Sequence, residues 1–98
     1  MRIYWSEDSL HDLESIRNYI SISNPLNAER FITELFDTAE LMLGNFPTSG
    51  RKIPEINDER FREIIHGYYR IMYKIQNEEI RILTVRNSNR SFSGEELP

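Results

Sequence analysis

A short break between two amphipathic stretches is the feature that most constrains this 98-residue chain. In residues 6–21, leucines and isoleucines recur at spacings of three and four, which is typical of a helix with one apolar face. Asn24 and Pro25 start a second stretch, since Asn favours the N-cap and Pro the first turn of a helix. Two helices joined by about three residues must fold back as an antiparallel hairpin.

The second stretch carries an apolar face that the first helix alone is too small to cover. We expect Gly44 to end this helix in a left-handed conformation, and Pro47 to prevent its continuation. A hairpin with such broad apolar faces needs a third layer against which to pack. The apolar positions of this stretch are Ala28, Phe31, Ile32, Leu35, Phe36, Ala39, Met42 and Leu43.

Three strand-like runs in the C-terminal half supply that layer, FREIIH, YYRIMYKI and EIRILTVR. Gly67 separates the first two, and Gln76-Asn77-Glu78 predicts a tight turn before the third. The middle run alternates, with apolar side chains on one face and cations among those on the other. Residues 2–5 predict one more strand at an edge, and the polar tail predicts either one helical turn or a frayed end.

The predicted fold is therefore α+β, with an N-terminal β-strand and an antiparallel helical hairpin packed on a small antiparallel β-sheet. We expect residues 1–98 to form a single domain. The chain lacks cysteine and has two distant histidines, a pattern that predicts neither a disulfide nor a metal site. No cofactor motif, membrane-spanning run or signal-peptide pattern is present, so we expect a cytoplasmic protein without a cofactor.

The charge is distributed unevenly along the chain. Residues 1–46 carry three basic and eight acidic side chains, a balance of −5. Residues 47–90 carry nine basic and six acidic side chains, a balance of +3, although the whole chain has a net charge of −4. This asymmetry predicts either a basic face that meets an anionic partner or an ordinary solvated surface.

Cations on the expected strands and on the loop before them leave two interpretations open. Arg62, Arg70 and Arg86 come from three different strands, and Arg51 lies in the loop GRK. Arg51 could bind phosphate or lie in an ordinary solvated loop. The three strand arginines could bind phosphates or form cross-strand pairs with glutamates, which we favour for most of them. The tyrosines of the middle run could likewise stack on bases, although packing in the core is the commoner use of such residues.

A series of short motifs gives the chain a resemblance to a known family. The series comprises WSxxSLxDLxxI at Trp5–Ile16, FPxSGR at Phe46–Arg51, PE at Pro54–Glu55, REI at Arg62–Ile64, YRIxY at Tyr69–Tyr73, ILxV at Ile82–Val85 and a closing Arg90. In this order and spacing, the motifs resemble the RelE/ParE superfamily of toxins from type II toxin–antitoxin modules, and in particular its ParE-like branch. The resemblance covers nearly the whole chain.

This resemblance implies a toxin, of the kind involved in plasmid stabilization, that stops growth by binding a replication target, namely DNA gyrase. It also implies a cognate antitoxin that neutralises the toxin in a hetero-oligomer, through an apolar helix or strand laid on the hairpin or the sheet. The residues that we expect to contact the target or the antitoxin are Arg51, Arg62, Arg70, Arg86 and Arg90. In this interpretation the protein is a binding inhibitor and not an enzyme.

Two other functions stay open. The other branch of the superfamily cuts messenger RNA on the ribosome, and in that case Arg70 and Arg90 would stabilise phosphate charge. Asn87 stands where many relatives carry His, and Phe92 lies where ribonucleases often carry Tyr. Neither residue can act as an acid or a base, which favours the inhibitor. A third possibility is a degenerate module that binds an antitoxin and poisons nothing.

Overall fold

The two predicted helices form a hairpin in the computed structural model, which describes residues 1–97. Helix α1 (Glu7–Ser21) begins at Ser6, whose hydroxyl accepts a hydrogen bond from the Ser9 amide (3.0 Å). Helix α2 (Pro25–Asn45) begins at Asn24, whose side chain accepts one from the Asn27 amide (3.1 Å). These caps satisfy amides that the first turn of a helix leaves without partners. Neither helix is long and apolar enough to span a membrane.

The predicted end of α2 at Gly44 is wrong. Gly44 lies inside the helix, and of the glycines in the described chain only Gly67 has a positive φ (60°). The helix instead ends at Asn45, and the amide of its C-cap residue Phe46 still donates to the Met42 carbonyl (2.8 Å). Pro47 follows directly and cannot donate to the next carbonyl of the series, so the chain leaves the helix without a left-handed residue.

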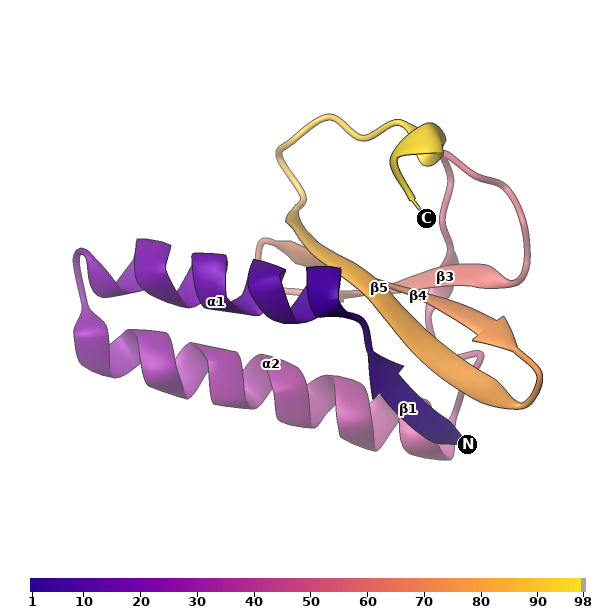
Figure 1. Cartoon of the computed structure of the whole chain (residues 1–98), viewed down its shortest axis with the longest axis horizontal. Coiled ribbons are helices and arrows are strands. Elements are labelled where there is room, and N and C mark those ends of the chain that lie inside the picture. The colour runs from indigo at the N-terminus through magenta and orange to yellow at the C-terminus, as the bar shows by residue number, and fades with distance from the viewer. Residues whose placement is uncertain (98) are drawn as a thin grey trace.

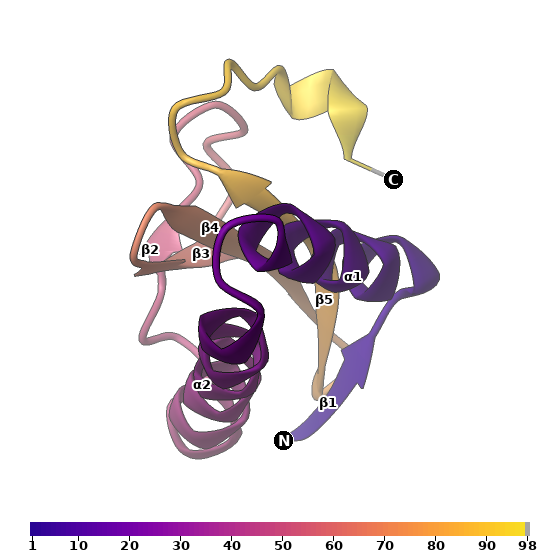
Figure 2. The same cartoon turned by 90° about the vertical axis from the view of Figure 1, so that its left-hand side faces the viewer.

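One five-stranded sheet completes the fold, in the spatial order β1-β5-β4-β3-β2 (Figures 1 and 2). The strands β3, β4 and β5 are the predicted antiparallel ones, and β1 occupies the predicted edge position but pairs with β5 in parallel. The sheet is thus mixed, and β2 is a short strand inside the expected loop. The bounds are β1 (Arg2–Trp5), β2 (Arg51–Lys52), β3 (Phe61–His66), β4 (Tyr69–Gln76) and β5 (Glu79–Asn87).

The two hairpin turns of the sheet fall where the sequence predicts them. Gly67 makes the first turn, and Asn77 and Glu78 make the second with φ of 53° and 60°. Two successive residues of positive φ are typical of a type I′ turn, whose twist matches that of antiparallel strands. The registers of β3, β4 and β5 are fixed by these turns and by the apolar face of the sheet.

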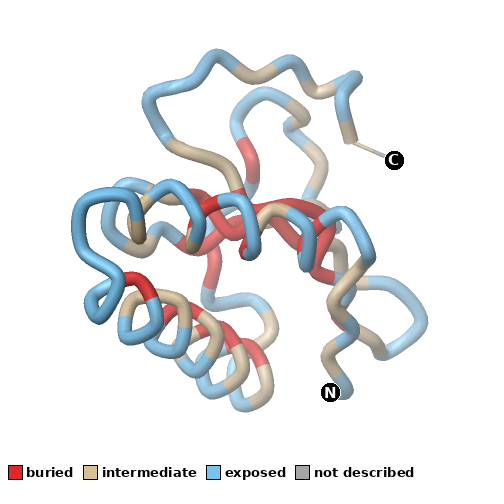
Figure 3. Tube along the Cα trace, turned by 60° about the vertical axis from the view of Figure 1, so that its left-hand side comes forward, coloured by how far each residue is buried: buried red, intermediate tan, exposed pale blue. Residues whose placement is uncertain are grey.

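The hairpin covers one face of the sheet, and the main core lies between these two layers (Figures 2 and 3). Leu35, Leu43, Ile71 and Tyr73 are fully buried there. Residues 91–97, which come after the turn that follows β5 and are here called the tail, lie on the opposite side, beside the loop between β2 and β3 (Figure 1). The tail contains one 3₁₀ turn (Gly94–Glu96), which is one of its two predicted states.

Candidate functional site

The loop after α2 is fastened to the sheet by Tyr73. Its hydroxyl donates to the Pro47 carbonyl (2.7 Å) and accepts from the Gly50 amide (3.0 Å). A Cβ at Gly50 would lie 2.6 Å from both the Tyr73 hydroxyl and the Glu63 carbonyl, so only glycine fits this approach. Burial raises the pKa of Tyr73, which keeps the phenol protonated and able to donate. The loop therefore has one defined path onto the sheet.

That path brings together a group of charged residues on the sheet face away from the helices. Arg70 Nε donates to Glu63 (2.6 Å), and its two terminal nitrogens donate to the two oxygens of Glu55 (2.9 and 2.7 Å). Arg51 Nε donates to the second oxygen of Glu63 (2.6 Å). We call Arg51, Glu55, Glu63 and Arg70 the arginine–glutamate cluster.

The cluster pairs its charges, and its two central members are buried. The Arg70 side chain is 7% exposed and that of Glu63 is fully buried. The hydrogen bond from Arg70 lowers the pKa of Glu55, and the Glu55 carboxylate in turn raises the pKa of Arg70. A buried guanidinium with two carboxylate partners has its donors committed. Arg70 therefore braces the loop against the sheet.

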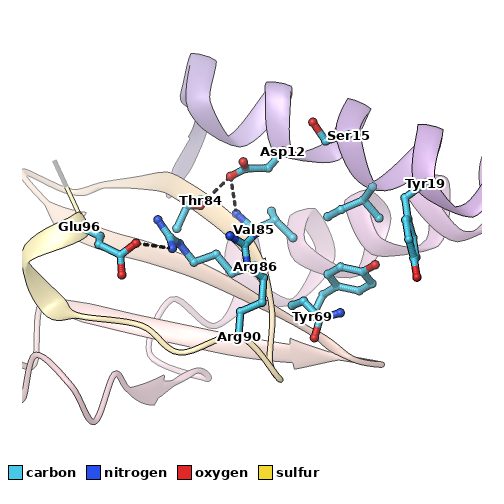
Figure 4. Close-up of a pocket in the computed structure, with 11 residues that line it drawn as sticks. Asp12, Ser15, Tyr19, Tyr69, Thr84, Val85, Arg86, Arg90 and Glu96 are labelled. Atoms are coloured by element: carbon cyan, nitrogen blue, oxygen red, sulfur yellow. Dashed lines mark hydrogen bonds and ion pairs between the residues drawn. The ribbon is translucent and has the colours of Figure 1, made fainter.

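A groove of about 510 Å³ lies beside this cluster, between α1, the end of β5 and the tail (Figure 4). Tyr19 and Ser15 line it from the helix, and Tyr69 and Arg86 line it from the sheet. Asp12 also faces it, but its carboxylate already accepts from the Thr84 hydroxyl (2.6 Å) and the Val85 amide (3.0 Å). In this way α1 caps the backbone edge of β5 where β1 no longer covers it.

The groove combines cations with aromatic rings. Arg90 is exposed, and Arg86 pairs with Glu96 of the tail (2.9 Å). Burial raises the pKa of Tyr69, so this phenol is a hydrogen-bond donor at neutral pH. The described residues 1–97 contain no group of three metal-ligating side chains. Such a groove is suited to bind an anionic or amphipathic partner.

A comparison with protein-family models identifies the family of the chain. Residues 3–92 match the model described as the ParE toxin of the type II toxin–antitoxin system parDE. The chain belongs to the ParE toxin family. This confirms the resemblance drawn from the motifs. Since a type II system pairs a toxin with an antitoxin protein, membership of the ParE family implies an antitoxin partner.

A solved structure from a ParDE system has a fold similar to that of this ParE family member. A chain described as the chromosomal ParDE TA system from P. aeruginosa superposes with a TM-score of 0.74. The two chains share 18% sequence identity, and the match covers 89% of this chain and 95% of the other. At this identity the likeness concerns the fold. Comparison with curated protein sequences gives no significant match.

In this ParE family member, the five arginines predicted to make contacts occupy three different settings. Arg51 and Arg70 belong to the arginine–glutamate cluster, whereas Arg86 and Arg90 line the groove. Arg62 lies on the helix side of the sheet, opposite Tyr73, and donates to the carbonyls of Glu59 (3.1 Å) and Gly50 (3.0 Å). The structure thus brings Arg86 and Arg90 together at one site and gives Arg62 a separate place.

The ParE motifs now have a structural meaning that sequence reasoning missed in part. Cross-strand pairs with glutamates were expected for most of the strand arginines, but only Arg70 makes one, to Glu63, so this expectation is wrong for Arg62 and Arg86. Sequence reasoning identified neither Glu55, the second partner of Arg70, nor Glu96, the partner of Arg86. Glu55 carried one usable signal, its place in the motif PE. Asp12 and Glu96 carried none, because their partners depend on how α1 and the tail cross the sheet.

Proposed function

We propose that this ParE family member acts in the cytoplasm as the toxin of a type II pair, inhibits DNA gyrase by binding it, and is neutralised by its cognate antitoxin in a hetero-oligomer. Family membership supports the toxin assignment. The choice between an inhibitor and a nuclease rests on Arg70. Of the two arginines that would stabilise phosphate charge in a nuclease, Arg70 is held by both Glu55 and Glu63, which leaves the exposed Arg90 alone in that role.

The groove gives further support to binding over cutting. Asn87 lines it and cannot transfer a proton, and the carboxylates of Asp12 and Glu96 are engaged by hydrogen bonds. Of the five candidate arginines, we propose that Arg86 and Arg90 make the contacts to target or antitoxin, because they lie in the groove. Arg51, Arg62 and Arg70 support those contacts by holding the loop and the sheet in place.

The test compares inhibition of gyrase with cleavage of messenger RNA. Purified full-length chain is titrated into a supercoiling reaction of purified gyrase, and messenger-RNA ends are mapped in cells after induction. We expect supercoiling to be inhibited, a DNA-damage response in cells and intact transcripts. Codon-phased cuts in translated messages would instead establish the ribosome-dependent endonuclease. A chain that binds the antitoxin but is without effect in both assays would be the degenerate module.

A matched pair of variants tests the site. Arg86→Ala/Arg90→Ala removes both groove cations, whereas Arg81→Ala removes an exposed cation from the other half of β5. Loss of a well-placed interface arginine costs about tenfold or more in affinity. We expect the double variant to lose inhibition by at least this factor and Arg81→Ala to retain it. Equal inhibition by both variants would place the contact outside the groove.

A further inference from the structure

Two arginines face each other across the middle of the sheet. Arg70 on β4 stands directly opposite Arg86 on β5. Like charges in this position repel and need anionic neighbours. Arg70 receives two carboxylates from the folded sheet and loop, Glu63 and Glu55. Within residues 1–97, the one carboxylate that pairs with Arg86 is Glu96, and it comes from the tail.

The tail makes a second contact with the same two arginines. The Phe92 ring centre lies 5.4 Å from the Arg70 guanidinium carbon and 5.2 Å from that of Arg86. Both distances fall within the range in which an aromatic face attracts a cation. A single ring thus bridges the facing pair, and a carboxylate four residues later completes the charge balance on Arg86.

The conformation of the tail fits this placement. The Ser93 amide donates to Glu96 (2.8 Å) and the Ser93 hydroxyl accepts from Glu95, which fixes Glu96 toward Arg86. Gly94 lies against the loop, where a Cβ would come 3.1 Å from the Glu55 carbonyl and 3.2 Å from Ile56. The surface under the tail therefore fits both the shape of the short turn and the charge of Glu96.

The tail is nevertheless a removable part of the molecule. None of residues 91–97 is buried, and the main core contains no side chain from them. Beneath them, the Arg86 Nε is buried and has no hydrogen-bond partner within residues 1–97. The surface formed by Arg70, Arg86 and the Glu55–Ile56 loop, here called the tail site, thus consists of strand and loop residues outside the tail and keeps one unused donor.

We infer that the tail site is a docking site for a partner segment that carries an aromatic residue and, four positions later, a carboxylate. The chain's own Phe92 and Glu96 are the internal occupant, which the partner segment displaces. The inference rests on the proposed function only for the identity of the partner, the neutralising antitoxin. Binding at this site also delivers the partner to the groove, because Arg86 and Glu96 belong to both.

A labelled peptide with the sequence of residues 91–98, SFSGEELP, is the probe. It is titrated against the full chain and against the full-length variant Phe92→Ala/Glu96→Gln, whose own tail has lost both anchors. Binding is followed by fluorescence anisotropy and by amide chemical shifts of Arg86 and Arg90. An internal occupant lowers the apparent affinity in proportion to its occupancy, so we expect the variant to bind at least about tenfold tighter.

Controls connect the binding to the two anchors. A peptide with Ala for Phe92 and Gln for Glu96 should not bind. In the anchor-less chain, Arg86→Ala should abolish binding, Arg86→Lys should restore part of it through the charge alone, and Arg81→Ala should leave it unchanged. Circular dichroism of every variant verifies the fold, and the partial recovery with Lys separates a lost contact from a lost fold.

Two results would overturn the inference. One is absence of binding to the anchor-less chain at peptide concentrations up to about 1 mM, where even weak complexes form. The other is Arg86-dependent binding of a short single-stranded RNA oligomer without peptide binding, which would assign the site to phosphate. Failure of gyrase inhibition would not affect either readout, since the peptide titration contains no gyrase.

Discussion

Arg70 and Arg86 are the same residue type at facing positions of neighbouring strands, yet they belong to two different regions of the molecule. Arg70 is buried among strand and loop residues, and its carboxylates come from β3 and from the loop before it. Arg86 is a quarter exposed and takes its carboxylate from the tail. The difference shows that the origin of the counter-charge, and not the arginine itself, decides whether such a residue supports the fold or can serve binding.

The depth of burial gives the two regions different energetic consequences. An ion pair removed from water is costly to break, because the partner left behind is a buried charge. An exposed pair is weak, because water and salt screen it. The arginine–glutamate cluster and the tail site should therefore respond very differently to equivalent substitutions.

Removal of the Arg70 side chain should have the largest effect. Arg70→Ala leaves Glu63 fully buried with only the exposed Arg51 as a partner, so the free energy of unfolding should fall by about 3–5 kcal/mol. Urea denaturation measures the loss. Arg81→Ala is the control, since Arg81 pairs only with Glu79 at 3.4 Å and is 57% exposed. A loss below about 1 kcal/mol for Arg70→Ala would contradict the role of the cluster as a brace.

Two glycine substitutions test the loop that carries Glu55 to the cluster. In Gly50→Ala, the added Cβ would lie 2.6 Å from the Glu63 carbonyl, so the loop must shift, at a cost of about 1–3 kcal/mol. In Gly44→Ala, the Cβ meets only Ile3 at 3.9 Å within a helix, and stability should rise by about 0.5–1 kcal/mol. Thermal unfolding of both variants shows whether each substitution raises or lowers stability. Two changes of the same sign would mean that Gly50 does not limit the approach of the loop.

Acid should weaken the cluster through Glu55. The pKa of Glu55 in the fold lies below its ordinary value of 4.5, so its stabilising effect is complete above pH 4.5 and is lost as the pH falls through the lower folded value. Glu55→Gln should therefore cost about 1 kcal/mol at pH 7, after allowance for its partial exposure, and progressively less toward pH 3. Urea denaturation across this range measures the difference. Glu34→Gln, on the exposed side of α2, provides a control whose difference should stay small throughout.

The fold was largely predictable because the helices and the central strands carry their own periodic signals. The cap at Asn24 and the turns at Gly67 and Asn77 are local features, and each was found at its predicted place. The left-handed end at Gly44 failed because Pro47 alone sufficed to stop the helix. The parallel pairing of β1 carries no local signal, since it depends on how the hairpin crosses the sheet.

The site was less predictable, for a related reason. Sequence spacing placed Arg70 on the face opposite the apolar stripe and predicted a cross-strand pair with a glutamate, but it did not identify Glu63 as the partner. The position of Glu55 depends on a loop whose path is set by Tyr73, and that of Glu96 depends on how the tail folds back. Contacts between a strand and an irregular segment have no period, so sequence patterns do not predict them.

Of these substitutions, Arg86→Ala should change the free energy of unfolding least. Its main effect should be to loosen the tail. The Arg86–Glu96 pair is exposed enough that its loss should alter the free energy of unfolding by less than about 1 kcal/mol. The tail, however, loses both its carboxylate partner and one cation beneath Phe92. Amide exchange at Ser93 and Glu96, whose amides are hydrogen-bonded within the turn, should accelerate while exchange in β4 and β5 stays slow. A destabilisation as large as that of Arg70→Ala would contradict the difference between the two arginines, because it would mean that the tail supports the fold.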